Sequence, residues 1–324
     1  MGDFLELPDG NILISYYEKN GGIIRTDNAL NFKQHYLFKQ SGYENPELNQ
    51  IWSLFRDEKG IVWAPNQKKS VLKLSLSNNK LWEDNDQSED DGINSIKQGS
   101  DGDVWMAYWS KGLGRVNNRK RTQNYYTSFL YPDMSVRRRV QSILVDENKV
   151  WVGSFQNGLQ VFDIRKEKFT EAFIVNERDK NSISSNTILD IIRYNKDTLL
   201  LATEMGVNIF DTKRNIFTAI TSKDGLPNNI VLGLMRDAHA DIWVVCSGGG
   251  LCKINMQNLA ITTYNINDGI IDNIFSGRIY SLKNGTALIA ASNSFISLRL
   301  QNLLHRRRRQ MYRLQGSVFL KKKK

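Results

Sequence analysis

The residue types that most often carry out catalysis are few and far apart in this chain of 324 residues. Its three histidines, His35, His239 and His305, lie in distant parts of the sequence. No group of His, Cys, Asp and Glu has the spacing of a metal site, and no Gly-x-Ser-x-Gly motif marks a nucleophilic serine. Acidic residues occur along the whole chain, so the sequence singles out no carboxylate pair for glycoside cleavage. We therefore predict no enzyme, no metal and no cofactor.

A second group of residues suggests binding. An exposed aromatic ring packs on the apolar face of a sugar, and amide or guanidinium groups pair with hydroxyls or carboxylates. Three short segments offer these groups, and we predict an oligosaccharide site, for a neutral or an acidic sugar, formed by Tyr108, Trp109, Arg137, Arg138, Arg139, Phe155, Gln156 and Asn157. The alternative is that the rings only pad neighbouring loops and that the arginines are solvated.

Two further features are weaker candidates for chemistry. The stretch EDNDQSEDDG, residues 83–92, is rich in carboxylates that suit calcium, but it lacks the fixed spacing of a calcium loop and is better explained as a solvated linker. Cys246 and Cys252 are too few for a disulfide framework. They flank a probable hairpin, and we expect two reduced thiols in preference to a disulfide.

The binding segments can meet only if the fold brings them together, and an internal repeat explains how. The stretch VQSILVDENKVWVGSFQNGLQVFD, residues 140–163, has counterparts that begin at Ile51, Ile93, Ile188 and Val231, with weaker ones at Phe4 and Ile279. One large apolar position recurs at intervals of 42 to 50 residues, at Leu13, Trp63, Trp105, Trp151, Leu200, Trp243 and Leu288. Seven copies of one unit indicate a radial or stacked repeat.

Each copy predicts four strands, which we name A to D in chain order. An apolar run forms strand A, an acid and a turn former follow, and strand B carries the Trp and ends in a small residue. A Gly-containing loop leads to strand C, which often closes on Asn or Asp, and a strand D rich in Phe and Tyr completes the unit. Four antiparallel strands repeated around an axis make an all-β, seven-bladed β-propeller, here over residues 1–300. The repeated Trp residues are then core spacers between blades.

In such a propeller the B–C loops and the D–A loops share the face that surrounds the mouth of the axial channel. The segments around Trp109 and Phe155 are B–C loops of the third and fourth blades, and Arg137 to Arg139 belong to the D–A loop between them. The fold therefore predicts one site for all three segments. We expect Asn186, Asn228 and Asn229, in other D–A loops, to form turns. The first copy begins at strand A, which leaves open how the ring closes.

The net charge of +10 comes mainly from the end of the chain. Residues 301–324 hold nine Lys or Arg residues and no acid, so the remaining body is close to neutral. A nucleic-acid footprint is expected over a folded face, and we predict no nucleic-acid partner for the body. The basic tail is better explained as a solvated or non-native end than as a nucleic-acid or membrane patch. We find no apolar run of about 18 residues and no leader peptide.

The repeats resemble the two-component regulator propeller repeat, a family whose unit carries Ser-Ile, Asp, Trp and Gly in the order seen in residues 140–163. The stretch DGLPNNIVLGLMRDAHADIWV, residues 224–244, resembles the same unit and the segment that joins units. The resemblance implies a periplasmic sensor module of hybrid two-component systems of Bacteroidetes, which recognises carbohydrate. It also implies a second propeller, a β-sandwich, a membrane span and a histidine kinase. Since this chain holds repeats for one propeller, we expect a fragment, an excised piece or a truncated reading frame.

Two other functional classes fit a propeller. A lyase resembling streptogramin lyase would need a His and acids at the mouth, and His35 on an outer strand is poorly placed for that role. An interaction scaffold resembling the WD-repeat proteins would carry Gly-His and Trp-Asp in each blade, and neither pair recurs here. We therefore favour a ligand-binding sensor module, and we leave a homodimer open.

Overall fold

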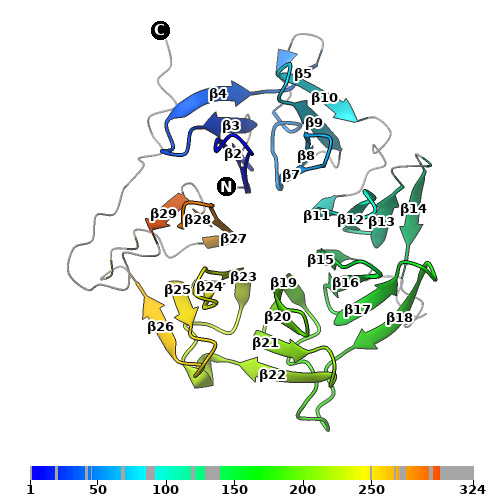
Figure 1. Cartoon of the computed structure of the whole chain (residues 1–324), viewed down its shortest axis with the longest axis vertical. Coiled ribbons are helices and arrows are strands. Elements are labelled where there is room, and N and C mark those ends of the chain that lie inside the picture. The colour runs from blue at the N-terminus through cyan, green and yellow to red at the C-terminus, as the bar shows by residue number, and fades with distance from the viewer. Residues whose placement is uncertain are drawn as a thin grey trace.

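The computed structural model describes residues 2–18, 21–40, 43–44, 46–66, 70–84, 92–117, 120, 122–127, 139–248, 250–265, 268, 270, 275–291 and 295–299. Within these residues seven antiparallel sheets, the blades, are arranged around a central axis with the first strand of each blade innermost, and an eighth sheet is a two-stranded hairpin (Figure 1). The predicted all-β, seven-bladed propeller is therefore confirmed. No helix in the described part of the chain is long and apolar enough to cross a membrane.

The first six blades are four-stranded meanders, as predicted. Blade 1 comprises β1 (Phe4–Glu6), β2 (Ile12–Ser15), β3 (Ile23–Thr26) and β4 (Phe32–Tyr36). Blade 2 comprises β7 (Phe55–Arg56), β8 (Ile61–Pro65), β9 (Val71–Ser75) and β10 (Lys80–Asp84), after a short hairpin of β5 (Lys39–Gln40) and β6 (Tyr43–Glu44). Blade 3 comprises β11 (Ile93–Gln98), β12 (Val104–Tyr108), β13 (Leu113–Val116) and β14 (Gln123–Tyr126).

The later blades continue the pattern. Blade 4 comprises β15 (Val140–Val145), β16 (Lys149–Ser154), β17 (Leu159–Asp163) and β18 (Lys168–Phe173). Blade 5 comprises β19 (Ile188–Asn195), β20 (Thr198–Thr203), β21 (Gly206–Asp211) and β22 (Ile216–Ile220), followed by the 3-10 turn η2 (Ser222–Asp224). Blade 6 comprises β23 (Val231–Arg236), β24 (Ile242–Cys246), β25 (Gly250–Ile254) and β26 (Ile261–Tyr264). Blade 7 has three described strands, β27 (Phe275–Ser281), β28 (Thr286–Ala291) and β29 (Phe295–Arg299).

The hydrophobic core is a ring of clusters that lie between neighbouring blades. Trp151 of blade 4 packs with Leu199 and Phe210 of blade 5, and Trp243 of blade 6 packs with Ala287 and Ile289 of blade 7. The other repeated slots are used in the same way, each against the next blade. Because one blade cannot bury its own face, the repeated apolar position is what joins one blade to the next. The predicted spacer role is confirmed.

In three blades the aspartate that precedes strand B accepts a hydrogen bond from the repeated Trp. The indole Nε1 of Trp63 donates to Asp57 at 2.9 Å, and that of Trp243 donates to Asp237 at 3.0 Å. Trp151 donates to its own turn aspartate in blade 4 at 2.8 Å. In blade 3 the corresponding residue is Gly99, and Nε1 of Trp105 is buried without a hydrogen-bond partner among the described residues. The acid and the Trp of the repeat are therefore one hydrogen-bonded unit, incomplete in blade 3.

The loops between blades are held by asparagine, as predicted. The backbone C=O of Asn186 accepts the N–H of Gly158 at 2.8 Å, and its side-chain Oδ1 accepts the N–H of Val175. Asn229 makes the same pair of bonds one blade later, to Gly206 and to Ser222. The side-chain oxygens of Asn186 and Asn229 are hydrogen-bonded within the D–A loops, which agrees with the predicted role of these residues in turns.

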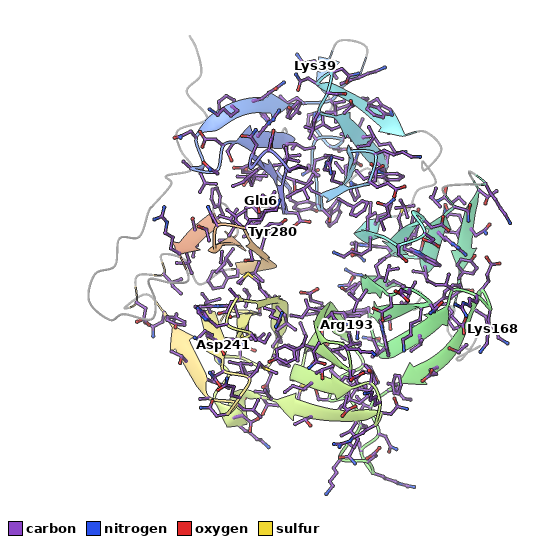
Figure 2. The ribbon with its side chains drawn as sticks, viewed as in Figure 1. Glu6, Lys39, Lys168, Arg193, Asp241 and Tyr280 are labelled. Carbon is purple, nitrogen blue, oxygen red and sulfur yellow. The ribbon has the colours of Figure 1, made fainter. Side chains whose placement is uncertain are left out.

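The ring closes through side chains, since blades 1 and 7 share no sheet within the described residues. Phe4 of β1 meets Phe295 of β29 edge to face, with ring centroids 5.7 Å apart. Glu6 and Tyr280 lie next to each other across this boundary (Figure 2), and the Glu6 N–H donates to the Tyr280 hydroxyl at 3.4 Å. Residues 300–324, which include the predicted basic tail, lie outside the described residues.

The two cysteines are free and buried, as expected of reduced thiols. The strand register places Cys252 opposite Val244 and Cys246 opposite Gly250, so the two residues are offset by two positions on neighbouring strands. The hydrogen bond that the Cys252 thiol donates to Cys246, together with burial, raises the pKa of the Cys252 thiol, which therefore stays protonated at neutral pH.

Candidate functional site

A cavity of about 640 Å³ occupies the axis of the propeller. Its walls come from the innermost strands of all seven blades, which explains why side chains distant in the sequence converge there. Polar side chains contribute much of the lining, and they include Ser53, Asn94, Gln141, Asp190 and Tyr280. The cavity has the size and mixed polarity of a small-molecule site.

A row of five side chains borders this cavity at the end where the B–C and D–A loops meet. The Tyr17 and Trp52 rings lie 4.6 Å apart, and the Trp52 and Trp109 rings lie 5.7 Å apart. The Arg139 guanidinium follows at 4.2 Å from the Trp109 ring and 5.3 Å from the Phe155 ring. We call these five residues, contributed by blades 1 to 4, the aromatic arc. Tyr17 and Trp52 are also part of the cavity wall.

Backbone hydrogen bonds between neighbouring loops fix the positions of the arc. The Phe155 N–H donates to the Arg139 C=O at 2.9 Å, and the Trp109 N–H donates to the Gly92 C=O at 2.9 Å. A Cβ added at Gly92 would lie 3.2 Å from the Trp109 ring, so the indole rests against that glycine. Each B–C loop is thus tied to the segment that enters its own blade.

Side-chain hydrogen bonds continue this order to the cavity wall. The Trp109 indole donates to Asn94, whose amide nitrogen donates to Gln141 Oε1 at 2.9 Å. The same Oε1 accepts a hydrogen bond from Arg139 Nε at 2.9 Å. Burial lowers the pKa of the Arg139 guanidinium from its usual value, although an arginine remains charged throughout the physiological range. These bonds fix the positions of Trp109 and Arg139 relative to each other.

The structure brings together three of the predicted site residues, Trp109, Arg139 and Phe155. Gln156 is exposed beside them, in a turn with φ of +71°. Arg137 and Arg138 lie outside the described residues.

Two predicted residues do not face the mouth. Tyr108 is the last residue of β12 and is buried, because its ring lies over Gly114, where an added Cβ would be 2.5 Å from Tyr108 Cε2. Its hydroxyl accepts from Gln123 at 3.0 Å inside the blade. Asn157 is also buried, next to the tight turn at Gly158. Placing both as exposed contacts was therefore wrong.

Sequence reasoning missed Tyr17 and Trp52. Tyr17 stands in the B–C loop of blade 1, the loop that corresponds to the one carrying Trp109. Trp52 occupies the second position of its repeat, where blades 3 and 4 have Asn94 and Gln141. Comparing these positions blade by blade would have found them, since the fold places equivalent positions around one rim.

The two aspartates of the cavity wall accept hydrogen bonds from the neighbouring blade. Asp3 Oδ2 accepts the backbone N–H of Leu54 in the next blade at 3.1 Å and the Ser53 hydroxyl at 2.9 Å. Asp190 occupies the equivalent position in blade 5, and its Oδ2 accepts the N–H of Leu234 in blade 6 at 3.2 Å. These carboxylates join neighbouring blades. They are thereby engaged in the fold.

The catalytic and metal-binding residue types do not gather at the mouth. His35 lies on β4, where its ring contacts the Gly21 C=O, and His239 lies in the turn after β23. Neither residue belongs to the cavity wall, and His305 is not among the described residues. The described residues contain no group of three or more His, Cys, Asp or Glu side chains that could hold a metal ion.

The chain is similar to parts of larger signalling proteins. No family model matches it. In sequence it is 27% identical over 186 residues to a protein named histidine kinase P4 from Formosa agariphila, a match that covers 55% of this chain and 13% of that protein. In structure it is similar to the extracellular domain of a putative hybrid two-component system from B. thetaiotaomicron, with 19% identity and a TM-score of 0.74. That match covers 91% of this chain and 38% of the other, and the predicted resemblance is confirmed.

A second group of similar structures consists of enzymes. A catalytically inactive histidine-to-alanine variant of virginiamycin B lyase from Staphylococcus aureus, solved with quinupristin, has 16% identity and a TM-score of 0.69. The match covers 91% of this chain and 93% of the lyase. At such identities the likeness shows the propeller fold alone.

Proposed function

We propose that this chain is the ligand-binding propeller of a hybrid two-component sensor and that it lies in the periplasm. The sequence similarity to a histidine kinase and the structural similarity to an extracellular sensor domain support this role. In the full-length protein the propeller would act with a second propeller, a β-sandwich and a histidine kinase. The chain binds and does not catalyse, so its output depends on those further domains.

An oligosaccharide is the ligand that the mouth of the propeller fits best. The observation that carries this proposal is the aromatic arc, with Trp109 37% exposed and stacked against the Arg139 guanidinium. Aromatic faces and a fixed cation next to a polar cavity combine the two kinds of contact that sugars require, ring packing and hydrogen bonding. Among the described residues the arc is formed by blades 1 to 4. The corresponding loop of blade 5 presents Met205, which is 48% exposed.

Isothermal titration calorimetry with a panel of oligosaccharides tests the proposal. We expect at least one oligosaccharide to bind, and we expect Trp109→Ala to weaken that binding by roughly fivefold, because a stacked aromatic ring contributes on the order of 1 kcal/mol. Met205→Ala is the matched control, since it removes an exposed apolar side chain from the same kind of loop outside the arc. Equal affinities of the two variants would reject the mouth as the site.

A lyase is the second candidate, because the lyase match covers nearly the full length of both chains. In that lyase a histidine-to-alanine change removes activity, whereas neither described histidine of this chain lines the cavity. Chromatography of quinupristin after incubation with the chain distinguishes the two functions. An unchanged antibiotic supports the sensor, and conversion would establish an enzyme.

A further inference from the structure

Arg139 is a cation without an anionic partner in the described part of the protein. It is half-buried, and its neighbours in the aromatic arc are two rings, those of Trp109 and Phe155. No carboxylate among the described residues lies within ion-pair distance of it. Two other half-buried cations do have such partners: Arg115 pairs with Asp103 at 2.7 Å, and Lys253 pairs with Asp241 at 2.9 Å.

The geometry of Arg139 leaves donors available for a ligand. A guanidinium carries five N–H groups in one plane, and only Nε of Arg139 has a hydrogen bond to the described residues, to Gln141. The guanidinium carbon lies 4.2 Å from the Trp109 ring centroid and 5.3 Å from the Phe155 ring centroid, and the four N–H groups other than Nε have no hydrogen-bond acceptor among the described residues. Partial burial of a charge costs free energy unless an opposite charge or hydrogen bonds compensate. An oxyanion at those N–H groups would compensate and would accept two parallel hydrogen bonds.

A second donor of the arc is also unused. The Trp52 indole nitrogen is buried and has no hydrogen-bond partner among the described residues, and Trp52 forms part of the cavity wall. The Trp109 indole differs, because its N–H is already engaged by Asn94. The arc therefore offers unused donors at Arg139 and Trp52, a combination that favours a ligand rich in acceptor oxygens.

We infer that the ligand is an anionic oligosaccharide whose carboxylate or sulfate group is bound by Arg139, with a sugar ring packed against Trp109 and a second oxygen bonded to Trp52. This inference rests on the proposed function, since it names the class of sugar bound at the same mouth. It assigns the discrimination between acidic and neutral sugars to one side chain.

Calorimetry with paired probes tests the inference. The probes are oligogalacturonides, the same oligosaccharides with their carboxyl groups reduced to alcohols, and a sulfated oligosaccharide with its desulfated form. We expect an acidic probe to bind more tightly than its neutral partner, and Arg139→Gln to weaken acidic binding by roughly 10- to 100-fold and neutral binding by much less. Arg178→Gln, at an exposed arginine in the next D–A loop, is the control and should change neither. Trp52→Phe keeps the ring and should weaken binding severalfold.

The outcomes separate the inference from the function on which it rests. Neutral probes that bind as tightly as acidic ones, or equal losses for both in Arg139→Gln, would overturn the anionic ligand and leave the oligosaccharide sensor standing. No binding of any probe would overturn both. If Arg139→Gln does not fold, the salt dependence of the unmodified protein decides, since affinity for the acidic probe must fall as sodium chloride rises while neutral binding stays constant.

Discussion

Two tryptophans of blade 3 lie four residues apart and have opposite surroundings. Trp105 is fully buried between blades 3 and 4, at the position that every blade fills with a large apolar residue. Trp109 stands in the next loop, 37% exposed, and stacks with Arg139 in an arrangement that, among the described residues, blades 1 to 4 form. The comparison teaches that features repeated in every blade hold the ring together, whereas features confined to one sector of the rim suit recognition.

A second contrast lies within the repeated position itself. Trp243 has its turn aspartate, Asp237, as hydrogen-bond partner, and Trp105 has none because Gly99 stands in that place. The repeated Trp is therefore present both with its indole hydrogen bond, in blade 6, and without it, in blade 3. The predictions below separate the contribution of the ring, of its hydrogen bond and of the turn around it.

The largest effect is expected from removing a spacer. Trp243→Ala should lower the free energy of unfolding by about 3–5 kcal/mol, because it leaves a cavity between blades 6 and 7. Trp109→Ala should lower it by less than about 1 kcal/mol, since that ring stands at the surface. Urea denaturation followed by circular dichroism measures both. Similar losses in the two variants would contradict the division between core and rim.

The next effect concerns the acid of the turn. Asp237→Ala should cost about 1–3 kcal/mol, because it leaves the Trp243 indole and the backbone N–H groups of His239 and Asp241 without their acceptor. A double-mutant cycle with Trp243→Phe isolates the indole bond. A coupling energy close to zero would show that the aspartate serves only the turn.

The incomplete blade offers a gain of stability. Gly99→Asp should raise the free energy of unfolding by about 1 kcal/mol by supplying an acceptor to Trp105. An added Cβ would lie 3.6 Å from Trp105 Nε1, and its tightest contact is the carboxylate end of Asp101, a side chain that can move. Gly99→Ala is the control for the loss of chain entropy. If Gly99→Asp is no more stable than Gly99→Ala, a hydrogen bond from the Trp105 indole contributes nothing to the free energy of unfolding.

The smallest effect concerns the turn between strands C and D. Hydrogen bonds from the backbone N–H of Arg214 and of Lys213 lower the pKa of Asp211. Its stabilising contribution is present above the unfolded pKa and is lost as pH falls through the lower folded value. Asp211→Asn keeps the acceptor and should flatten the loss of stability between neutral pH and about pH 3. Asn255 accepts equivalent bonds in blade 6, so Asn255→Asp should steepen that loss.

The blades were predictable because each boundary has a large apolar residue, Trp or Leu, at the same place in the repeat. Because the pattern occurs seven times, a weak match in one copy does not change the predicted fold, and the weak copies around Leu13 and Leu288 do form blades. The meeting of Trp109, Arg139 and Phe155 was predictable for the same reason, since the topology alone brings the two kinds of loop together.

Side-chain direction at the rim was not predictable. Tyr108 and Trp109 are adjacent in the sequence, yet one ring enters the blade over Gly114 and the other lies at the mouth. That choice depends on the space left by the neighbouring strand, which no local pattern encodes. Trp52 escaped notice because it is a departure from a position usually polar in the neighbouring blades, and Arg137 and Arg138 remain untested.

The boundary between blades 1 and 7 has a mechanical consequence. Every other pair of neighbouring blades is joined by the continuous polypeptide, whereas these two meet through apolar contacts such as Phe4 with Phe295 and through hydrogen bonds at Glu6. Tension applied across that boundary would separate the first and last blades before it unravelled a sheet. We therefore expect the ring to open first at the boundary between blades 1 and 7, which lies opposite blade 4 (Figure 1).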